Sequence, residues 1–159
     1  MRILIALDAS PHCERTLDFA SRMRWPAGSR LIIVAVASPI VGSLAAPYEP
    51  AAAAPGLLED QRRPLQEAVA RAEVLLRETG FATEGRVDVG DPRQVLLEVA
   101  QDVRADLIVM GSHGLTGITK LMLGSVSSHV VTHAPCSVLV VKQATGKGKG
   151  PPVRKEDKS

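Results

Sequence analysis

The strongest constraint on the fold is that short aliphatic runs alternate along the chain with longer segments of helical periodicity. The runs expected to form strands are Arg2–Leu7, Leu31–Ala37, Thr83–Val89, Asp106–Met110 and Ser137–Val141. The segments expected to form helices begin at Ser10–Pro11 and at Asp91–Pro92, or span Leu57–Thr79 and Ser125–His133. Nearly continuous apolar runs are typical of strands that are buried on both faces. The alternation therefore predicts an α/β fold, a doubly wound five-stranded parallel sheet with helices on both faces.

The composition narrows the classes of protein that fit this pattern. The 159 residues suffice for one domain whose core needs no disulfide or metal. Aromatic residues make up only 3% of the chain, so the core must be aliphatic and a stacking platform for single-stranded nucleic acid is not expected. Cys13 and Cys136 lack the spacing of a metal site or a disulfide framework. No apolar run approaches the roughly 18 residues of a membrane span, and none at the N-terminus suits a signal peptide. We therefore expect a cytoplasmic protein without a membrane partner.

The small positive charge of the chain, formally +2, is concentrated at its C-terminus. Residues 143–159 contain five lysines and arginines against two acidic residues, and glycine and proline are frequent among them. This composition predicts a disordered basic tail. Residues 1–142 are slightly acidic as a whole and are expected to form the folded domain, so nucleic acid is not an expected partner.

Glycine and serine residues cluster where the fourth expected strand ends and the last expected helix begins. Gly111 and Gly114 follow the strand, and Gly124 and Ser125 open the helix. Ligands of doubly wound sheets bind beyond the carboxyl ends of the strands, and a helix N-terminus directs its N–H groups at an anion. The cluster therefore offers the chemistry that a polyphosphate needs, although it is neither a Walker A motif nor a strand-one dinucleotide motif. The alternative is a tight turn and a helix cap with solvated serines.

The spacing of this cluster from Gly111 to Ser125 resembles G-x2-G-x9-G-[ST], the nucleotide-binding motif of the universal stress protein family. The resemblance extends to the opening I-L-I-A-L-D-A-S and to the stretch A-D-L-I-V-M-G-S-H-G-L-T-G. It continues through the closing L-G-S-V-S-S-H-V-V-T-H-A-P-C-S-V-L-V-V and covers residues 1–142.

The resemblance implies strand order 3-2-1-4-5, a homodimer in most members, and ATP with Mg²⁺ as the bound ligand. The family's binding residues can be carried over by position. The adenine or ribose end would then be held by Asp8 and Val36, and the ribose and phosphates would be flanked by Met110, Gly111 and Gly114. The phosphates would be held by Gly124, Ser125, Val126 and Ser127.

Two of the polar features have structural alternatives. Asp8 ends the first expected strand, where its carboxylate would accept hydrogen bonds from the nucleotide or, alternatively, from the backbone of the following turn. His129 and His133 are four residues apart on the last expected helix, a spacing that can grip a metal. Because no third ligand follows them, a surface pair is expected there instead.

The expected function is that of an ATP-binding regulator in stress response or signalling, which would act on a further protein partner. No clear general base is present, so efficient turnover is not expected, and any hydrolysis or autophosphorylation would be slow. One alternative is a scaffold or chaperone-like protein of the same fold that uses no nucleotide. Another is a flavodoxin-like electron carrier, although the aromatic residues that would stack on FMN lie far in sequence from the glycine cluster.

The last expected strand is short, apolar and, in the implied strand order, at the edge of the sheet. An apolar edge strand invites association unless another chain pairs with it or a segment covers it. We therefore expect a homodimer in which Val138, Leu139, Val140 and Val141 pair antiparallel with the same residues of a second copy. The alternative is a monomer whose edge is shielded by residues 143–159.

Overall fold

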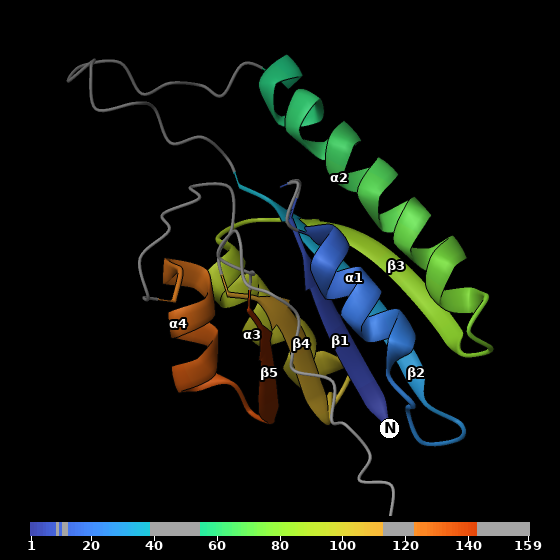
Figure 1. Cartoon of the computed structure of the whole chain (residues 1–159). Coiled ribbons are helices and arrows are strands. Elements are labelled where there is room, and N and C mark those ends of the chain that lie inside the picture. The colour runs from blue at the N-terminus through green and yellow to red at the C-terminus, as the bar shows by residue number, and fades with distance from the viewer. Residues whose placement is uncertain (9, 11–12, 39–54, 113–122, 143–159) are drawn as a thin grey trace, which may run out of the picture.

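The computed structural model describes residues 1–8, 10, 13–38, 55–112 and 123–142. These residues form one sheet with helices on both of its faces (Figure 1). The strands are β1 (Arg2–Leu7), β2 (Arg30–Ala37), β3 (Ala82–Val89), β4 (Leu107–Gly111) and β5 (Ser137–Val141). The helices are α1 (Cys13–Arg22), α2 (Pro55–Arg77), α3 (Pro92–Asp102) and α4 (Ser125–His133). All the expected elements are therefore present, with boundaries that move by a few residues.

The sheet has the strand order β3-β2-β1-β4-β5, and every neighbouring pair is parallel. This confirms the doubly wound fold that the alternation predicted. The chain leaves β1 toward β2 and β3 on one side and returns to add β4 and β5 on the other. The point of reversal, between β1 and β4, is where ligands of such sheets bind.

The core is aliphatic, as the composition required, and it is divided by the sheet. On one face α1 and α2 cover a cluster that includes Ile3, Ile5 and Ile33, and on the other α3 and α4 cover a cluster that includes Leu4 and Ile108 (Figure 1). Adjacent residues of each central strand thus contribute to opposite clusters, which is the alternation of an extended strand. Both faces of β1 and β2 are buried, which explains their nearly continuous apolar sequences.

Helical spacing within Leu57–Thr79 predicts one buried stripe of Leu65, Val69, Ala72, Leu75 and Leu76, and the stripe observed on α2 differs from it at one leucine. Leu65, Val69, Ala72 and Leu76 are buried, whereas Leu75 is 41% exposed. An α-helix turns by about 100° per residue, so Leu75 lies to the side of the stripe that Leu76 occupies. Placing Leu75 in the core was therefore wrong.

Two turns depend on glycine. Gly80 follows α2 with φ +88°, and its N–H donates to the carbonyl of Arg77 at 3.0 Å, so it ends the helix. Gly90 joins β3 to α3 with φ +151°, and a Cβ atom there would lie 2.8 Å from Cγ2 of Val95. The turn into α3 therefore requires glycine both for its backbone angle and for close packing.

The start of α3 confirms the predicted cap. The Asp91 side chain accepts a hydrogen bond from the Arg93 N–H at 2.9 Å, and proline occupies the first turn. The Arg93 guanidinium folds back onto the same carboxylate, with Nε 3.0 Å from both of its oxygens. These hydrogen bonds lower the pKa of Asp91 from 3.8 to about 2.

We expect this cap to make the stability of the protein depend on pH in the acidic range. Replacing Asp91 by Asn keeps a capping oxygen but removes the charge that Arg93 contacts. Because the folded-state pKa is depressed to about 2, the advantage of Asp over Asn should be complete above pH 4 and lost as the pH falls through 2. Melting temperatures of both proteins between pH 7 and pH 1.5 test this. A difference that is as large at pH 1.5 as at pH 6 would contradict it.

Some predictions concern residues that the structure does not describe. The expected disordered tail, residues 143–159, and the first-turn proline at position 11 lie outside the described residues. In the part of the chain that is described, no helix is long and apolar enough to cross a membrane.

Candidate functional site

The predicted site residues that the structure describes lie at the ends of β1, β2 and β4 or in the first turn of α4. These ends are on the side of the sheet opposite the N-terminus (Figure 1). Leu7 pairs with Ala35, so the next residues, Asp8 and Val36, lie at the same level of the sheet. Ala6 pairs with Met110, and both belong to the cluster that α3 and α4 cover, as Val36 does. The ends of β2, β1 and β4 therefore present these residues side by side on the face where α4 begins.

Backbone hydrogen bonds join the two ends of the loop between β4 and α4, which carries the glycine cluster. Gly124 N–H donates to the Ser112 carbonyl at 2.8 Å, and Ser112 N–H donates to the Val141 carbonyl at 3.0 Å. Ser112 is only 5% exposed, so these bonds are shielded from water. The end of β5, the end of β4 and the start of α4 are thus fixed to one another, although residues 113–122 between them are outside the description.

A side-chain hydrogen bond fixes α4 to the same place. The Ser127 hydroxyl donates to the Gly111 carbonyl at 2.9 Å, and Ser127 is 3% exposed. Ser127 was expected at the phosphates, but in this arrangement its hydroxyl hydrogen is already engaged with Gly111. The observed contact makes Ser127 a positioning residue that holds the first turn of α4 against the end of β4.

The N-terminus of α4 is suited to an anion. Gly124 is its N-cap and supplies no side-chain capping bond. The first N–H groups of a helix have no partner within the helix, and they carry the positive end of its dipole. Ser125 is exposed at this end, and the neighbouring Val126 packs into the core and anchors the turn. The arrangement offers directed N–H groups and an exposed serine side chain at the start of α4.

Asp8 makes the local contacts that the structural alternative predicted. Its Oδ1 accepts hydrogen bonds from the Ser10 hydroxyl at 2.6 Å and from the Ser10 N–H at 3.2 Å. Asp8 is half-buried, and both of these bonds fall on one carboxylate oxygen. The bonds to Ser10 fix the orientation of the carboxylate, so they are compatible with a second role for the other oxygen.

The thiol of Cys13 lies close to this carboxylate, at the start of α1. Burial, and secondarily the charge of Asp8, raise the pKa of Cys13. A raised pKa disfavours the thiolate at neutral pH, so the structure supports a packed thiol rather than a reactive one. Both cysteines are free in the structure.

Some predicted residues are not placed with the others. Gly114 lies outside the described residues, so its position in the loop stays a prediction. His129 and His133 stack on each other with ring centroids 4.2 Å apart, and His133 Nδ1 contacts the His129 carbonyl at 2.9 Å. Within the described ranges, no group of three or more His, Cys, Asp or Glu side chains could hold a metal ion.

Two features of this edge were not found from the sequence. Ser112 links β4, β5 and α4, yet its serine identity gives no signal, because the links use backbone atoms. Arg86 and Asp88 form an ion pair on β3, with Nη2 2.9 Å from Oδ1 and Nε 2.9 Å from Oδ2, and Asp88 is the register partner of Val36. Opposite charges two residues apart in an expected strand could have indicated this pair, since they project from the same face.

Comparison with known proteins gives a consistent result across sequence and structure. A family model described as "Universal stress protein family" matches residues 1–142. A universal stress protein of Thermus aquaticus is 36% identical over 146 residues, which are 88% of this chain and 97% of that protein. One from Synechocystis is 33% identical over 149 residues, 89% of this chain and 97% of that protein. Among solved structures, a universal stress protein in complex with cAMP is 27% identical with a TM-score of 0.63, and the match covers 89% of this chain and 96% of that one.

Proposed function

The chain belongs to the universal stress protein family, and from this premise we propose that it binds ATP at the carboxyl edge of its sheet. The observation that carries the proposal is the hydrogen-bonded junction of Ser112, Gly124 and Val141, which fixes the N-terminus of α4 beside the end of β4. That the similar structure contains cAMP, an adenine nucleotide, supports the same class of ligand. The protein would act as a regulator in stress response or signalling, through a nucleotide-dependent interaction with a further protein.

The phosphates would lie against the first turn of α4. The N–H groups of Ser125 and Val126 and the Ser125 hydroxyl are the donors available to them, because the Gly124 N–H already bonds Ser112. Gly111 and Gly124 leave room for phosphate oxygens to approach the backbone. Ser127 would contribute by holding this turn in place, and Gly114 would line the phosphates from within the loop.

The adenosine end would lie along β1 and β2. Val36, which is apolar and half-buried, would face the base, and Met110, which is buried on β4 beside β1, would flank the ribose. Asp8 would accept a hydrogen bond from the adenine or ribose on the carboxylate oxygen that Ser10 does not engage. The three residues come from three neighbouring strands, so one rigid sheet sets their spacing.

The Mg²⁺ that accompanies ATP would be held mainly by the phosphates. Mg²⁺ usually keeps several water molecules and takes few ligands from a protein. When bound, the ion would neutralise phosphate charge, while Ser125 and the α4 N–H groups orient the phosphate chain.

The proposed role is binding rather than efficient catalysis. Asp8, the carboxylate nearest the proposed ribose position, is engaged with Ser10 and is not arranged as a base for a water molecule at the phosphates. Any hydrolysis or autophosphorylation would then be slow. We assign residues 1–142 as the nucleotide-binding domain, place residues 143–159 outside it, and propose a cytoplasmic location, in keeping with two free thiols.

We expect ATP to stabilise the purified protein. A ligand that binds only the folded state at a hundred times its Kd raises the free energy of unfolding by about 2.7 kcal/mol. Thermal unfolding with millimolar ATP and Mg²⁺ should therefore show a clear rise in Tm, which GTP, with the same phosphates, should produce less strongly. An unchanged Tm with every adenine nucleotide would favour the scaffold alternative.

We further propose that the protein is a homodimer paired through β5. Among the described strands, β5 contacts only β4, so its outer edge has no partner strand. Its four aliphatic residues, Val138, Leu139, Val140 and Val141, are only half-buried, although each packs against one of the two core clusters. Antiparallel pairing with β5 of a second copy would extend both clusters across a two-fold axis.

A further inference from the structure

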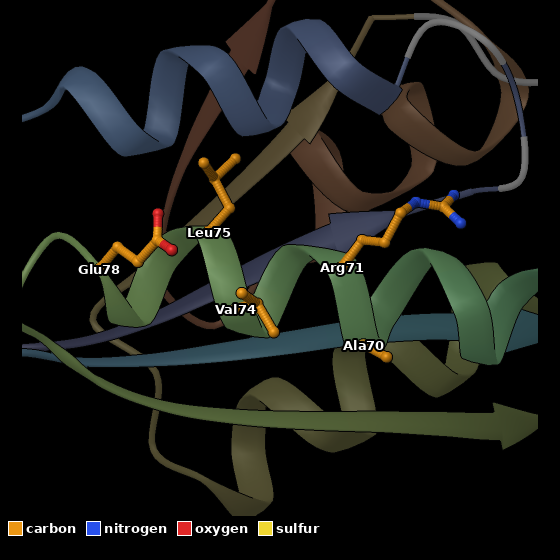
Figure 2. Close-up of a pocket in the computed structure, with 5 residues that line it drawn as sticks. All are labelled: Ala70, Arg71, Val74, Leu75 and Glu78. Atoms are coloured by element: carbon orange, nitrogen blue, oxygen red, sulfur yellow. The ribbon is translucent and has the colours of Figure 1, made fainter.

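A second surface, on α2, carries a pattern that neither the core nor the nucleotide site uses. Ala70, Arg71, Val74, Leu75 and Glu78 line an open, mostly apolar groove along this helix (Figure 2). We call these five residues the α2 patch. Val74 is 58% exposed and Leu75 is 41% exposed, so two adjacent aliphatic side chains face the solvent. Exposing such a pair of apolar side chains to water is unfavourable in free energy, and a partner that covers the α2 patch would exclude the water.

The patch is framed by two opposite charges that have no partner within the helix. The other arginines of α2 each contact a glutamate three or four residues away, namely Arg62 with Glu59, Arg63 with Glu67, and Arg77 with Glu73. No ion pair of Arg71 or Glu78 occurs among the residues that the structure describes. These two are seven residues apart, about 10.5 Å along a helix axis at 1.5 Å per residue, which is too far for them to pair with each other.

The order of these residues is self-complementary. Arg71 and Glu78 lie at equal distances on either side of the midpoint between Val74 and Leu75. When two such helices run antiparallel with that midpoint on a two-fold axis, Arg71 of each meets Glu78 of the other. Val74 of each then meets Leu75 of the other at the centre. All four residues share one face, since spacings of three, four and seven bring side chains together on a helix.

We propose that a second copy of this chain docks on the α2 patch in this antiparallel register. The occupant is a second copy because one helix supplies both halves of the match, an apolar centre and a charge of each sign. The interface would be separate from β5 and from the nucleotide site, because α2 covers the sheet face opposite to α3 and α4. A chain with both the β5 and the α2 contacts would assemble beyond a dimer.

Charge reversal tests the proposal without altering the apolar core. Because the charge of Arg71 also acts on Cys13 at the start of α1, the Glu78→Arg variant is the reversal farther from Asp8. Arg71→Glu would bring two glutamates together at each end of the patch, and Glu78→Arg would bring two arginines together. Each reversal replaces two attractive pairs with two repulsive ones and should weaken this association by at least about tenfold. Sedimentation velocity of the full chain over a range of concentrations measures the effect against wild type, whatever the contribution of β5.

Recombining the charges gives the matched controls. Mixing Arg71→Glu protein with Glu78→Arg protein creates attractive pairs at both ends, so the mixture should associate more strongly than either variant alone. The double variant Arg71→Glu/Glu78→Arg should also recover association near the wild-type level. High salt should reduce the differences between these proteins, because exposed ion pairs are screened.

Three results would overturn the proposal. One is an association state that neither reversal changes, with circular dichroism showing that both variants are folded. A second is weakening by the single variants with no recovery in the mixture or in the double variant, which would exclude the antiparallel register. The third is association through α2 that occurs only after residues 143–159 are deleted, which would assign the patch to the chain's own C-terminal segment.

Discussion

Gly124→Val should abolish measurable ATP binding while the protein stays folded. Gly124 has φ −58° and ψ 159°, backbone angles that valine adopts without strain, and its N–H would still reach Ser112. The new branched side chain would instead occupy the space through which a phosphate must approach the start of α4. Valine is a poorer N-cap than glycine, so a small fall in Tm is expected, but no side-chain capping bond is lost and the protein should stay folded.

Ser125→Asp should have a similar effect for an electrostatic reason. It sets a negative charge against the phosphates at the position where the helix offers its N–H groups, and like-charge contacts cost several kcal/mol, so ATP affinity should fall at least about 100-fold. The same charge near the N-terminus favours the helix, so Tm without ligand should not fall.

Isothermal titration calorimetry of the two variants with ATP and Mg²⁺ measures both effects. Ser128→Asp is the matched control, because it adds the same charge to the exposed surface of α4 one turn further from the phosphates. It should weaken ATP binding far less than Ser125→Asp does. Wild-type affinity in both Gly124→Val and Ser125→Asp would mean that the nucleotide binds elsewhere.

Val140→Pro should split the β5 dimer into monomers without unfolding the domain. The Val141 carbonyl accepts a hydrogen bond from Ser112, so the backbone of Val141 faces β4. Successive residues of a strand turn their backbone groups to opposite sides, so the N–H of Val140 points to the open edge. Proline at 140 therefore removes a donor from the dimer edge and leaves the ladder to β4 intact.

Val141→Pro is the contrasting variant, because its proline ring lies on the side of β5 that pairs with β4. Val141→Pro should lower Tm. Val140→Pro should instead lower the molar mass in solution from that of a dimer to that of a monomer and leave Tm nearly unchanged. Light scattering gives the masses, for the full chain and for one that ends at Lys142. A Val140→Pro protein that keeps the wild-type mass would contradict the β5 interface. A wild-type monomer that aggregates only when it ends at Lys142 would support shielding by residues 143–159 instead.

The parts of the structure that the sequence predicted are those governed by strong local rules. Short continuous aliphatic runs bounded by turn residues are typical of strands buried on both faces, and Asp91 followed by Pro92 combines a capping residue with the proline favoured in the first turn of a helix. The strand order is different in kind, because it followed from the resemblance to a family and not from periodicity. The gathering of Asp8, Val36 and Met110 at one edge then follows from the parallel order itself, since all the strands end on the same side.

The features that could not be predicted depend on contacts between distant segments. Ser127 looks like any serine at a helix start, and only its distance to the Gly111 carbonyl reveals a positioning role. The sequence spacing of Leu75 and of Leu76 fits the buried stripe of a helix about equally well. Only the packing of α2 on the sheet shows that Leu76 is buried and Leu75 is exposed. The self-complementary order of the α2 patch likewise becomes visible only once Val74 and Leu75 are known to be exposed.

The central claim, that an adenine nucleotide binds where β1 and β4 end and α4 begins, is tested most directly by amide chemical shifts. The ¹⁵N-labelled wild-type protein is titrated with ATP and Mg²⁺, and each assigned amide is followed. We expect the largest shifts at Gly111, Ser125 and Val126, while the amide signals of residues at the opposite edge, such as Arg30 and Asp106, do not shift. Shifts confined to the opposite edge or to α2, or no shifts at millimolar ATP, would contradict it.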